Sequence, residues 1–131
     1  MAGNELAFTL IEFAILLNLK HLICEFIVQT PHIAESKMRY GSINSIIHLF
    51  HHAFGTLVVG LLVDFNIGLT LGLIAVESLL HYHIDWLHMK FGAHSYKDKR
   101  YWQWLGIEQF LHYQTYMLMI ILARYVLINH S

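Results

Sequence analysis

The chain has 131 residues, of which 56 % are hydrophobic and 13 % are charged, and its formal net charge is −1 at pH 7. Soluble domains carry roughly 25 % charged residues, so this composition excludes a disordered tail, a basic nucleic-acid-binding arm and an ordinary soluble enzyme. Eleven histidines outnumber the eight lysines and arginines. Because histidine is costly in lipid, so apolar a chain needs a reason to keep so many imidazole groups.

Four long apolar segments follow one another along the chain, at about residues 5–28, 43–63, 67–91 and 101–128. Each is long enough to cross a hydrocarbon layer of roughly 30 Å as a helix that rises about 1.5 Å per residue. Within each segment, most His, Asp and Glu residues lie in one half, and the other half is mainly apolar. The sequence therefore predicts an all-α polytopic membrane protein, in which residues 1–131 form a single domain.

The connections between these segments predict how the helices are arranged. Pro31 ends the first helix, because the residue before a proline is pushed out of the α region. Residues 64–66 form a tight turn between the second and third helices, and residues 92–100 form a lysine-rich loop. Short connections favour antiparallel neighbours. We therefore expect an up-down-up-down bundle of four transmembrane helices.

The basic residues are distributed unevenly between the two ends of this predicted bundle. Only Arg124 falls towards the end with the termini. By the positive-inside rule, we expect a multi-pass protein of the inner (plasma) membrane, with loops 29–42 and 92–100 in the cytoplasm and both termini outside. The seven basic residues towards the loop end are Lys20, Lys37, Arg39, Lys90, Lys97, Lys99 and Arg100.

Every predicted helix also carries one pair of potential metal ligands spaced four residues apart. Residues with this spacing lie on one face of a helix, so each pair can point towards a single centre. One pair is weak evidence, but four pairs on four helices are much stronger. The pairs are His21 and Glu25, His48 and His52, His81 and Asp85, and Glu108 and His112.

The four pairs lie at one depth in the predicted bundle, roughly 10–15 Å below the loop end at 1.5 Å per residue. Eight such side chains suit two metal ions, or one ion with polar side chains around its ligands. Imidazole and carboxylate groups without a usable thiol favour zinc, and also suit manganese or iron, over magnesium or calcium. We therefore predict a site for one or two divalent transition-metal ions. The alternative is that these histidines only hydrogen-bond between helices.

The ligand pairs also carry a resemblance to a known family. The segment from His21 to Thr30 resembles the opening His-x-x-x-Asp-Phe-x-x-Gln motif of small bacterial and phage integral membrane proteins of unknown function. The similarity continues through His48 and His52, residues 81–86 and residues 108–112, and glutamate replaces the usual aspartate at positions 25 and 108. The chain is more remotely similar to membrane-bound metal-dependent hydrolases with His-x-x-x-Asp motifs. That similarity implies that this protein catalyses a hydrolysis reaction.

The first functional hypothesis is therefore a metal-dependent hydrolase that acts on a lipid or a phosphoester at the cytoplasmic face. A bound metal ion would activate water and polarise the substrate, and Asp85, Glu25 or Glu108 would serve as general base. The basic loop residues would attract an anionic lipid headgroup. The bilayer is the expected partner, and nucleic acid is not.

Two alternatives belong to other classes. A non-catalytic membrane protein could bind metal, relay ions or bind a partner, and as a transporter it would need to form a homo-oligomer, because four helices are few. The run His48-x-x-His51-His52 also matches the histidine box of membrane di-iron oxidases and hydroxylases. This second alternative rests on one short motif, in a chain far smaller than those enzymes.

Overall fold

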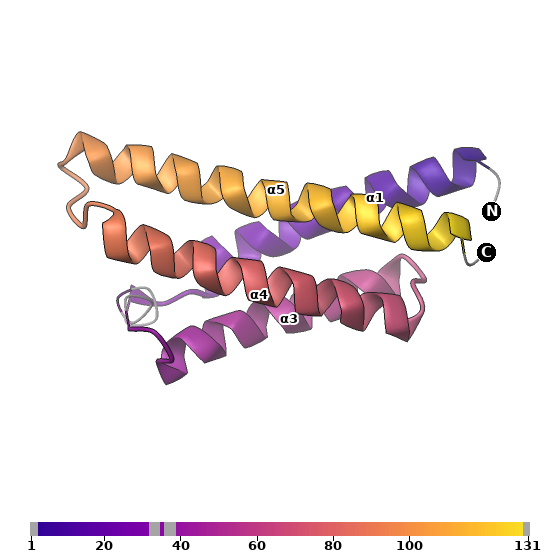
Figure 1. Cartoon of the computed structure of the whole chain (residues 1–131), viewed down its shortest axis with the longest axis horizontal. Helices are drawn as coiled ribbons and strands as arrows, with labels where there is room; N and C mark the ends of the chain where they lie inside the picture. Colours follow the sequence, from indigo (N-terminus) through magenta and orange to yellow (C-terminus); the bar gives the residue numbers. More distant parts are fainter. Residues whose placement is uncertain (1–2, 32–34, 36–38, 130–131) are drawn as a thin grey trace.

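The computed structural model describes residues 3–31, 35 and 39–129 (Figure 1). Within these ranges the chain forms four long antiparallel helical segments, and no strand is present. The first segment is α1 (Gly3–Leu22), which continues directly into a π-helix, η1 (Ile23–Val28). The others are α3 (Ile43–Leu62), α4 (Ile67–Phe91) and α5 (Lys99–Asn129). The prediction of an all-α protein with four helices is confirmed, and the helix ends lie within two residues of the expected ones.

The four helices form a closed ring, in which each packs against its neighbours in the chain and α1 also packs against α5. The N- and C-terminal ends lie at one end of the bundle together with the turn between α3 and α4 (Figure 1). The last turns of η1 and α4 and the first turns of α3 and α5 lie at the other end, which we call the loop end. All four ligand pairs are therefore carried on helices that run past one another at the same level.

Local side-chain interactions fix where the helices begin. Ser42 and Asn66 cap α3 and α4: the Ser42 hydroxyl accepts a hydrogen bond from Ser45 N at 3.2 Å, and the Asn66 side chain accepts one from Leu69 N at 2.9 Å. These caps satisfy amide groups that the first helical turn leaves without partners. At the start of α5, Arg100 N donates to Asp98 Oδ1 at 2.9 Å, and the Arg100 guanidinium lowers the pKa of the Asp98 carboxyl.

The apolar core occupies the half of the bundle that holds the termini. Phe13 and Phe65 pack with their ring centroids 4.9 Å apart, and Met119 and Ala123 of α5 are completely buried. Gly60 allows α3 to approach α4 closely, because a Cβ at this position would lie 2.6 Å from Thr70 Cγ2. The close packing of this half fixes the positions of the four helices relative to one another.

The distribution of polar and apolar residues is the reverse of that in a soluble protein. Among the described residues, fifteen polar or charged residues are buried against eleven hydrophobic ones. Large apolar side chains such as Phe8, Phe50 and Ile121 are exposed on the outside of the bundle. The four helical segments in the described part of the chain are long and apolar enough to cross a membrane, with mean hydropathies between 1.3 and 1.7 over their most apolar stretches.

Candidate metal centre

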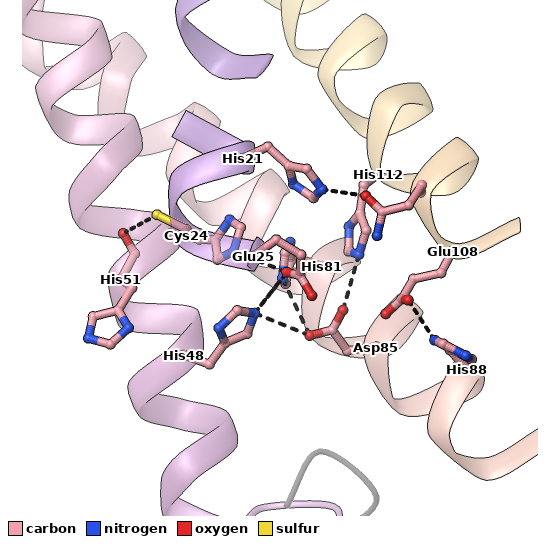
Figure 2. Close-up of polar contacts among 12 residues, drawn as sticks. His21, Cys24, Glu25, His48, His51, His81, Asp85, His88, Glu108 and His112 are labelled. Atoms are coloured by element: carbon pink, nitrogen blue, oxygen red, sulfur yellow. Dashed lines mark hydrogen bonds and ion pairs between the residues drawn. The ribbon is translucent and has the colours of Figure 1, made fainter. Parts of the chain in front are cut away.

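The π-helix η1 brings Glu25 into the centre of the bundle. A π-helix has wider turns than an α-helix, and short π segments often occur at functional sites. Here the wide turn carries Cys24 and Glu25, which are both buried. The Cys24 thiol donates to the His51 carbonyl oxygen of α3 at 3.6 Å, whereas the Glu25 carboxylate lies among the histidines (Figure 2).

Six of the eight predicted ligands meet at this point, in two overlapping groups. The first group is Glu25, His48, His52 and His81, and the second is Glu25, His81, Asp85 and His112. In each group, one ligand atom from every residue lies within 4.8 Å of all the others. The two groups share Glu25 and His81, and together they draw on η1, α3, α4 and α5.

The distances within these groups fit a metal ion. His81 Nε2 lies 3.3 Å from His48 Nε2 and 3.4 Å from Asp85 Oδ2, and His48 Nε2 lies 3.1 Å from Glu25 Oε2. Four ligands placed tetrahedrally at about 2.0–2.1 Å from a zinc ion would lie about 3.3 Å from one another. A pocket of about 10 Å³ lies beside His48, His81 and Asp85, a volume comparable to that of one water-sized sphere.

The hydrogen bonding of His52 supports the same conclusion. Its Nε2 is buried and has no hydrogen-bond partner among the described residues, although Glu25 Oε2 is 3.4 Å away. A buried nitrogen without a partner is costly, so such atoms usually have an explanation in a bound ion or water. In the second group, His112 Nε2 lies 3.1 Å from Asp85 Oδ1, which joins α5 to α4 (Figure 2).

The other two predicted ligands, His21 and Glu108, lie beside these groups and have other partners. His21 Nδ1 is 2.8 Å from the Tyr116 hydroxyl, and its Nε2 is 2.7 Å from Gln109 Oε1. Glu108 is held by His88, whose Nδ1 is 2.5 Å from Glu108 Oε2. Both nitrogens of His21 are thus in hydrogen bonds, and its ring packs 5.1 Å from that of His112.

The three histidines of the predicted histidine box lie on different faces of α3. His48 and His52 point into the ligand groups, whereas His51 lines a groove between α1 and α3 on the outside of the bundle. Figure 2 shows the ring of His51 turned away from Glu25 and His81. Only two of the three histidines of the box therefore contribute to the centre.

The structure also contains a buried ion pair that the sequence did not predict. Lys20 pairs with Glu77, and Glu77 also accepts a hydrogen bond from Thr56. Lys20 Nζ lies 3.2 Å from His52 Nδ1, so this ion pair lies directly behind a predicted ligand. The sequence places Lys20 among the basic residues towards the loop end, but the structure buries it between helices. The count towards that end is therefore six rather than seven.

The spacing of residues in the sequence indicates that Lys20 and Tyr116 face the inside of the bundle. Phe13, Leu17, Lys20 and Cys24 recur at intervals of four, three and four residues, which places Lys20 on the inner face of α1. In α5, Tyr116 continues the face of Glu108 and His112 by the same spacing. A lysine usually lies at the surface of a protein, so its residue type alone does not predict that Lys20 is buried.

Comparison with known protein families assigns the chain to a family. Residues 13–131 match the family described as "Protein of unknown function (DUF3307)". The chain therefore belongs to this family, whose activity is uncharacterised, and the resemblance to a family of unknown function is confirmed. No curated protein and no solved structure matches the chain.

Proposed function

We propose that this protein is an integral membrane metalloenzyme that hydrolyses a lipid or a phosphoester near the loop end of the bundle. The observation that carries the proposal is the meeting of six buried histidine and carboxylate side chains from all four helical segments. Ionisable groups inside a membrane are expensive, and they mark functional sites. All six belong to one copy of the chain, so the site does not require a homo-oligomer.

The donor atoms indicate which cofactor is expected. Four imidazoles and two carboxylates, without a thiol in the groups, suit one or two divalent transition-metal ions. Zinc is our first choice, followed by manganese and iron. When bound, such an ion supplies Lewis-acid chemistry that polarises a carbonyl or phosphoryl oxygen and activates water.

The carboxylates of the chain have different proposed roles. Glu25 and Asp85 belong to the ligand groups and would hold the ion. Glu108 lies outside both groups and lines the same cavity as Glu25. We propose Glu108 as the general base that accepts a proton from water. His88, at 2.5 Å from Glu108 Oε2, would hold this carboxylate in place.

The proposed orientation places the loop end in the cytoplasm and both termini outside the inner (plasma) membrane. Six basic residues towards the loop end against Arg124 at the other end support it through the positive-inside rule. The same residues would hold the loops against anionic lipid headgroups. The substrate would then enter from the cytoplasmic leaflet.

The metal content of the purified protein tests the proposal. We expect one or two equivalents of zinc by elemental analysis, together with hydrolysis of p-nitrophenyl decanoate or bis-p-nitrophenyl phosphate. Chelation should abolish the hydrolysis, and added zinc should restore it. Full hydrolysis by metal-stripped protein would contradict the proposal. Two equivalents of iron with substrate-dependent oxygen uptake would favour the oxidative alternative instead.

A second candidate function is an ion relay without catalysis. The buried pair of Lys20 and Glu77 favours it, because it extends the line of ionisable groups from His52 towards the terminal half. Chains of such groups carry protons or ions through membrane proteins. A metal- or proton-dependent flux in proteoliposomes, without any hydrolysis, would support this alternative.

A further inference from the structure

Buried polar side chains from three helices meet at the Nδ1 atom of His52. Lys20 Nζ lies 3.2 Å from this nitrogen, and Glu77 Oε1 lies 3.8 Å from it. Glu77 also pairs with Lys20 and accepts a hydrogen bond from Thr56. All four side chains are buried. The proposed reaction uses His52 as a metal ligand but gives no role to Lys20 or Glu77.

The contact between Lys20 and His52 determines which ring nitrogen carries the proton. An ammonium group has three N–H donors and no acceptor, so His52 Nδ1 is the acceptor of this hydrogen bond. A neutral imidazole then carries its proton on Nε2. This Nε2 atom faces the first ligand group, where Glu25 Oε2 lies 3.4 Å away. A protonated nitrogen has no lone pair to give to a metal ion, so this tautomer cannot bind an ion through Nε2.

Binding of an ion at Nε2 would reverse the role of Nδ1. The proton would then lie on Nδ1, and a histidine that binds a metal ion usually donates this second N–H to a carboxylate, a carbonyl oxygen or water. Glu77 Oε1 is the carboxylate oxygen in position, and its distance of 3.8 Å from Nδ1 has to shorten by about 1 Å for a hydrogen bond. A neutral imidazole carries one proton in both forms, so the proton lost from Nε2 is balanced by the proton gained at Nδ1.

Lys20 can release His52 without becoming an unpaired charge. It keeps its ion pair with Glu77, and its Nζ lies 5.0 Å from the centre of the Tyr116 ring, within the distance at which an aromatic face attracts a cation. The Glu77 carboxylate has about four lone-pair sites, so it can accept from Lys20, Thr56 and His52 at the same time. The change of tautomer therefore needs only a small movement inside the bundle.

We propose that Glu77 is a positioning residue of the metal centre, and that Lys20 holds His52 in the tautomer that does not bind metal until an ion enters the first ligand group. The ion then takes His52 Nε2, and His52 Nδ1–H donates to Glu77 in place of its contact with Lys20. This inference rests on the proposed function and adds a control on ion binding to it. The control acts on the first group only, because the second group does not contain His52.

Nuclear magnetic resonance of the histidine nitrogens tests the change of tautomer. The sample is the full chain in detergent with nitrogen-15 histidine, and His52→Ala identifies the signals of His52. In metal-free protein we expect His52 to carry its proton on Nε2, and after addition of zinc we expect the proton on Nδ1. A proton on Nδ1 in the metal-free protein would overturn the proposal. A tautomer that stays the same when zinc binds would also overturn it.

Variants without Lys20 measure the contribution of Glu77. They are made in a His112→Ala parent, which lacks a ligand of the second group only, and the absorption of cobalt(II) reports binding. Lys20→Met/Glu77→Gln keeps an acceptor oxygen behind His52, whereas Lys20→Met/Glu77→Leu removes it, and neither variant buries a charge at these two positions. The leucine variant should bind cobalt 10–100-fold more weakly than the glutamine variant, the usual effect of losing the partner of a metal-bound histidine. Lys97→Met, at an exposed lysine, is the control and should bind as the parent does.

The outcomes separate this proposal from the proposed enzyme. Equal cobalt affinities in the two double variants, with the circular dichroism of the parent, would overturn the positioning role and leave the enzyme in place. Loss of all binding in the His112→Ala parent, when the wild type binds cobalt, would show that the first group is not a site and would overturn the role of Glu77 as well. Absence of zinc and cobalt binding in the wild type would overturn both proposals.

Discussion

The side chains of Lys20 and Glu77 form an ion pair inside the bundle, where they are only 5 % and 1 % exposed. Gly55 makes room for this pair, because a Cβ at that position would lie 2.5 Å from Lys20 Cγ. Lys20 Nζ also lies 5.0 Å from the centre of the Tyr116 ring. The pair therefore depends on all four helices, since Lys20, Gly55, Glu77 and Tyr116 belong to α1, α3, α4 and α5.

Breaking this ion pair should destabilise the protein strongly. Lys20→Met leaves the Glu77 carboxylate buried without its cation, which costs about 3–5 kcal/mol in comparable buried pairs. The double variant Lys20→Met/Glu77→Leu removes both charges and should recover most of this loss. Unfolding in detergent, followed by circular dichroism, measures both variants. Asp98→Asn, which breaks the exposed pair with Arg100, is the control and should have little effect. A single variant as stable as the wild type would contradict the prediction.

Gly55 and Gly72 should respond in opposite ways to replacement by alanine. Alanine favours a helix over glycine by up to about 1 kcal/mol, and a Cβ at Gly72 would meet no atom within 4 Å. Gly72→Ala should therefore be neutral or stabilising. Gly55→Ala should lower the unfolding temperature, because its Cβ would displace the stem of Lys20 from Glu77. Equal unfolding temperatures for the two variants would show that Lys20 adjusts without cost.

The two overlapping ligand groups predict a graded loss of metal. His81 belongs to both groups, whereas His48 belongs only to the first and His112 only to the second. If two ions bind, His48→Ala and His112→Ala should each retain about half of the metal that the wild type carries. His81→Ala should retain the least, and His51→Ala should match the wild type. Elemental analysis of the four purified variants measures this, and a full metal content in His81→Ala would refute the two-group arrangement.

Labelling of introduced cysteines tests the proposed orientation. Ser95→Cys lies in the connection at the loop end, and Asp64→Cys lies in the turn at the opposite end. The native Cys24 is buried and should give little background. In intact cells, a membrane-impermeant maleimide should label Asp64→Cys and should label Ser95→Cys only after the membrane is permeabilised. The reverse pattern would place the termini in the cytoplasm.

Much of this architecture follows from regular periodicities in the sequence. Four apolar segments of sufficient length, joined by short connections, predict antiparallel helices. A spacing of four residues then places His48 with His52 and His81 with Asp85 on inward faces. Because both features depend only on helix geometry, the helix bounds and the level of the ligand pairs could be inferred without any knowledge of side-chain contacts.

The remaining features depend on competition between side chains. The position of His21 suits a ligand as well as that of His48 does, but Tyr116 and Gln109 engage both of its ring nitrogens. Glu108 is likewise engaged by His88. Sequence spacing gives the face of a helix on which a residue lies, but not which of several neighbours on that face it will contact. The π-helical turn at Ile23–Val28 had no recognisable signal in the sequence either.

That π-helical turn contributes residues both to the candidate metal centre and to the cavity at the loop end. Glu25 belongs to both metal-ligand groups, and it lines a cavity of about 570 Å³ together with Gln29, the first residue after η1. The angular relation between these side chains is set by the wide turn that separates them. Loss of a single residue from this stretch would return it towards α-helical geometry and rotate Glu25 and Gln29 together. One backbone irregularity thus governs how the cavity is aligned with the centre, and a change in its length would alter both at once.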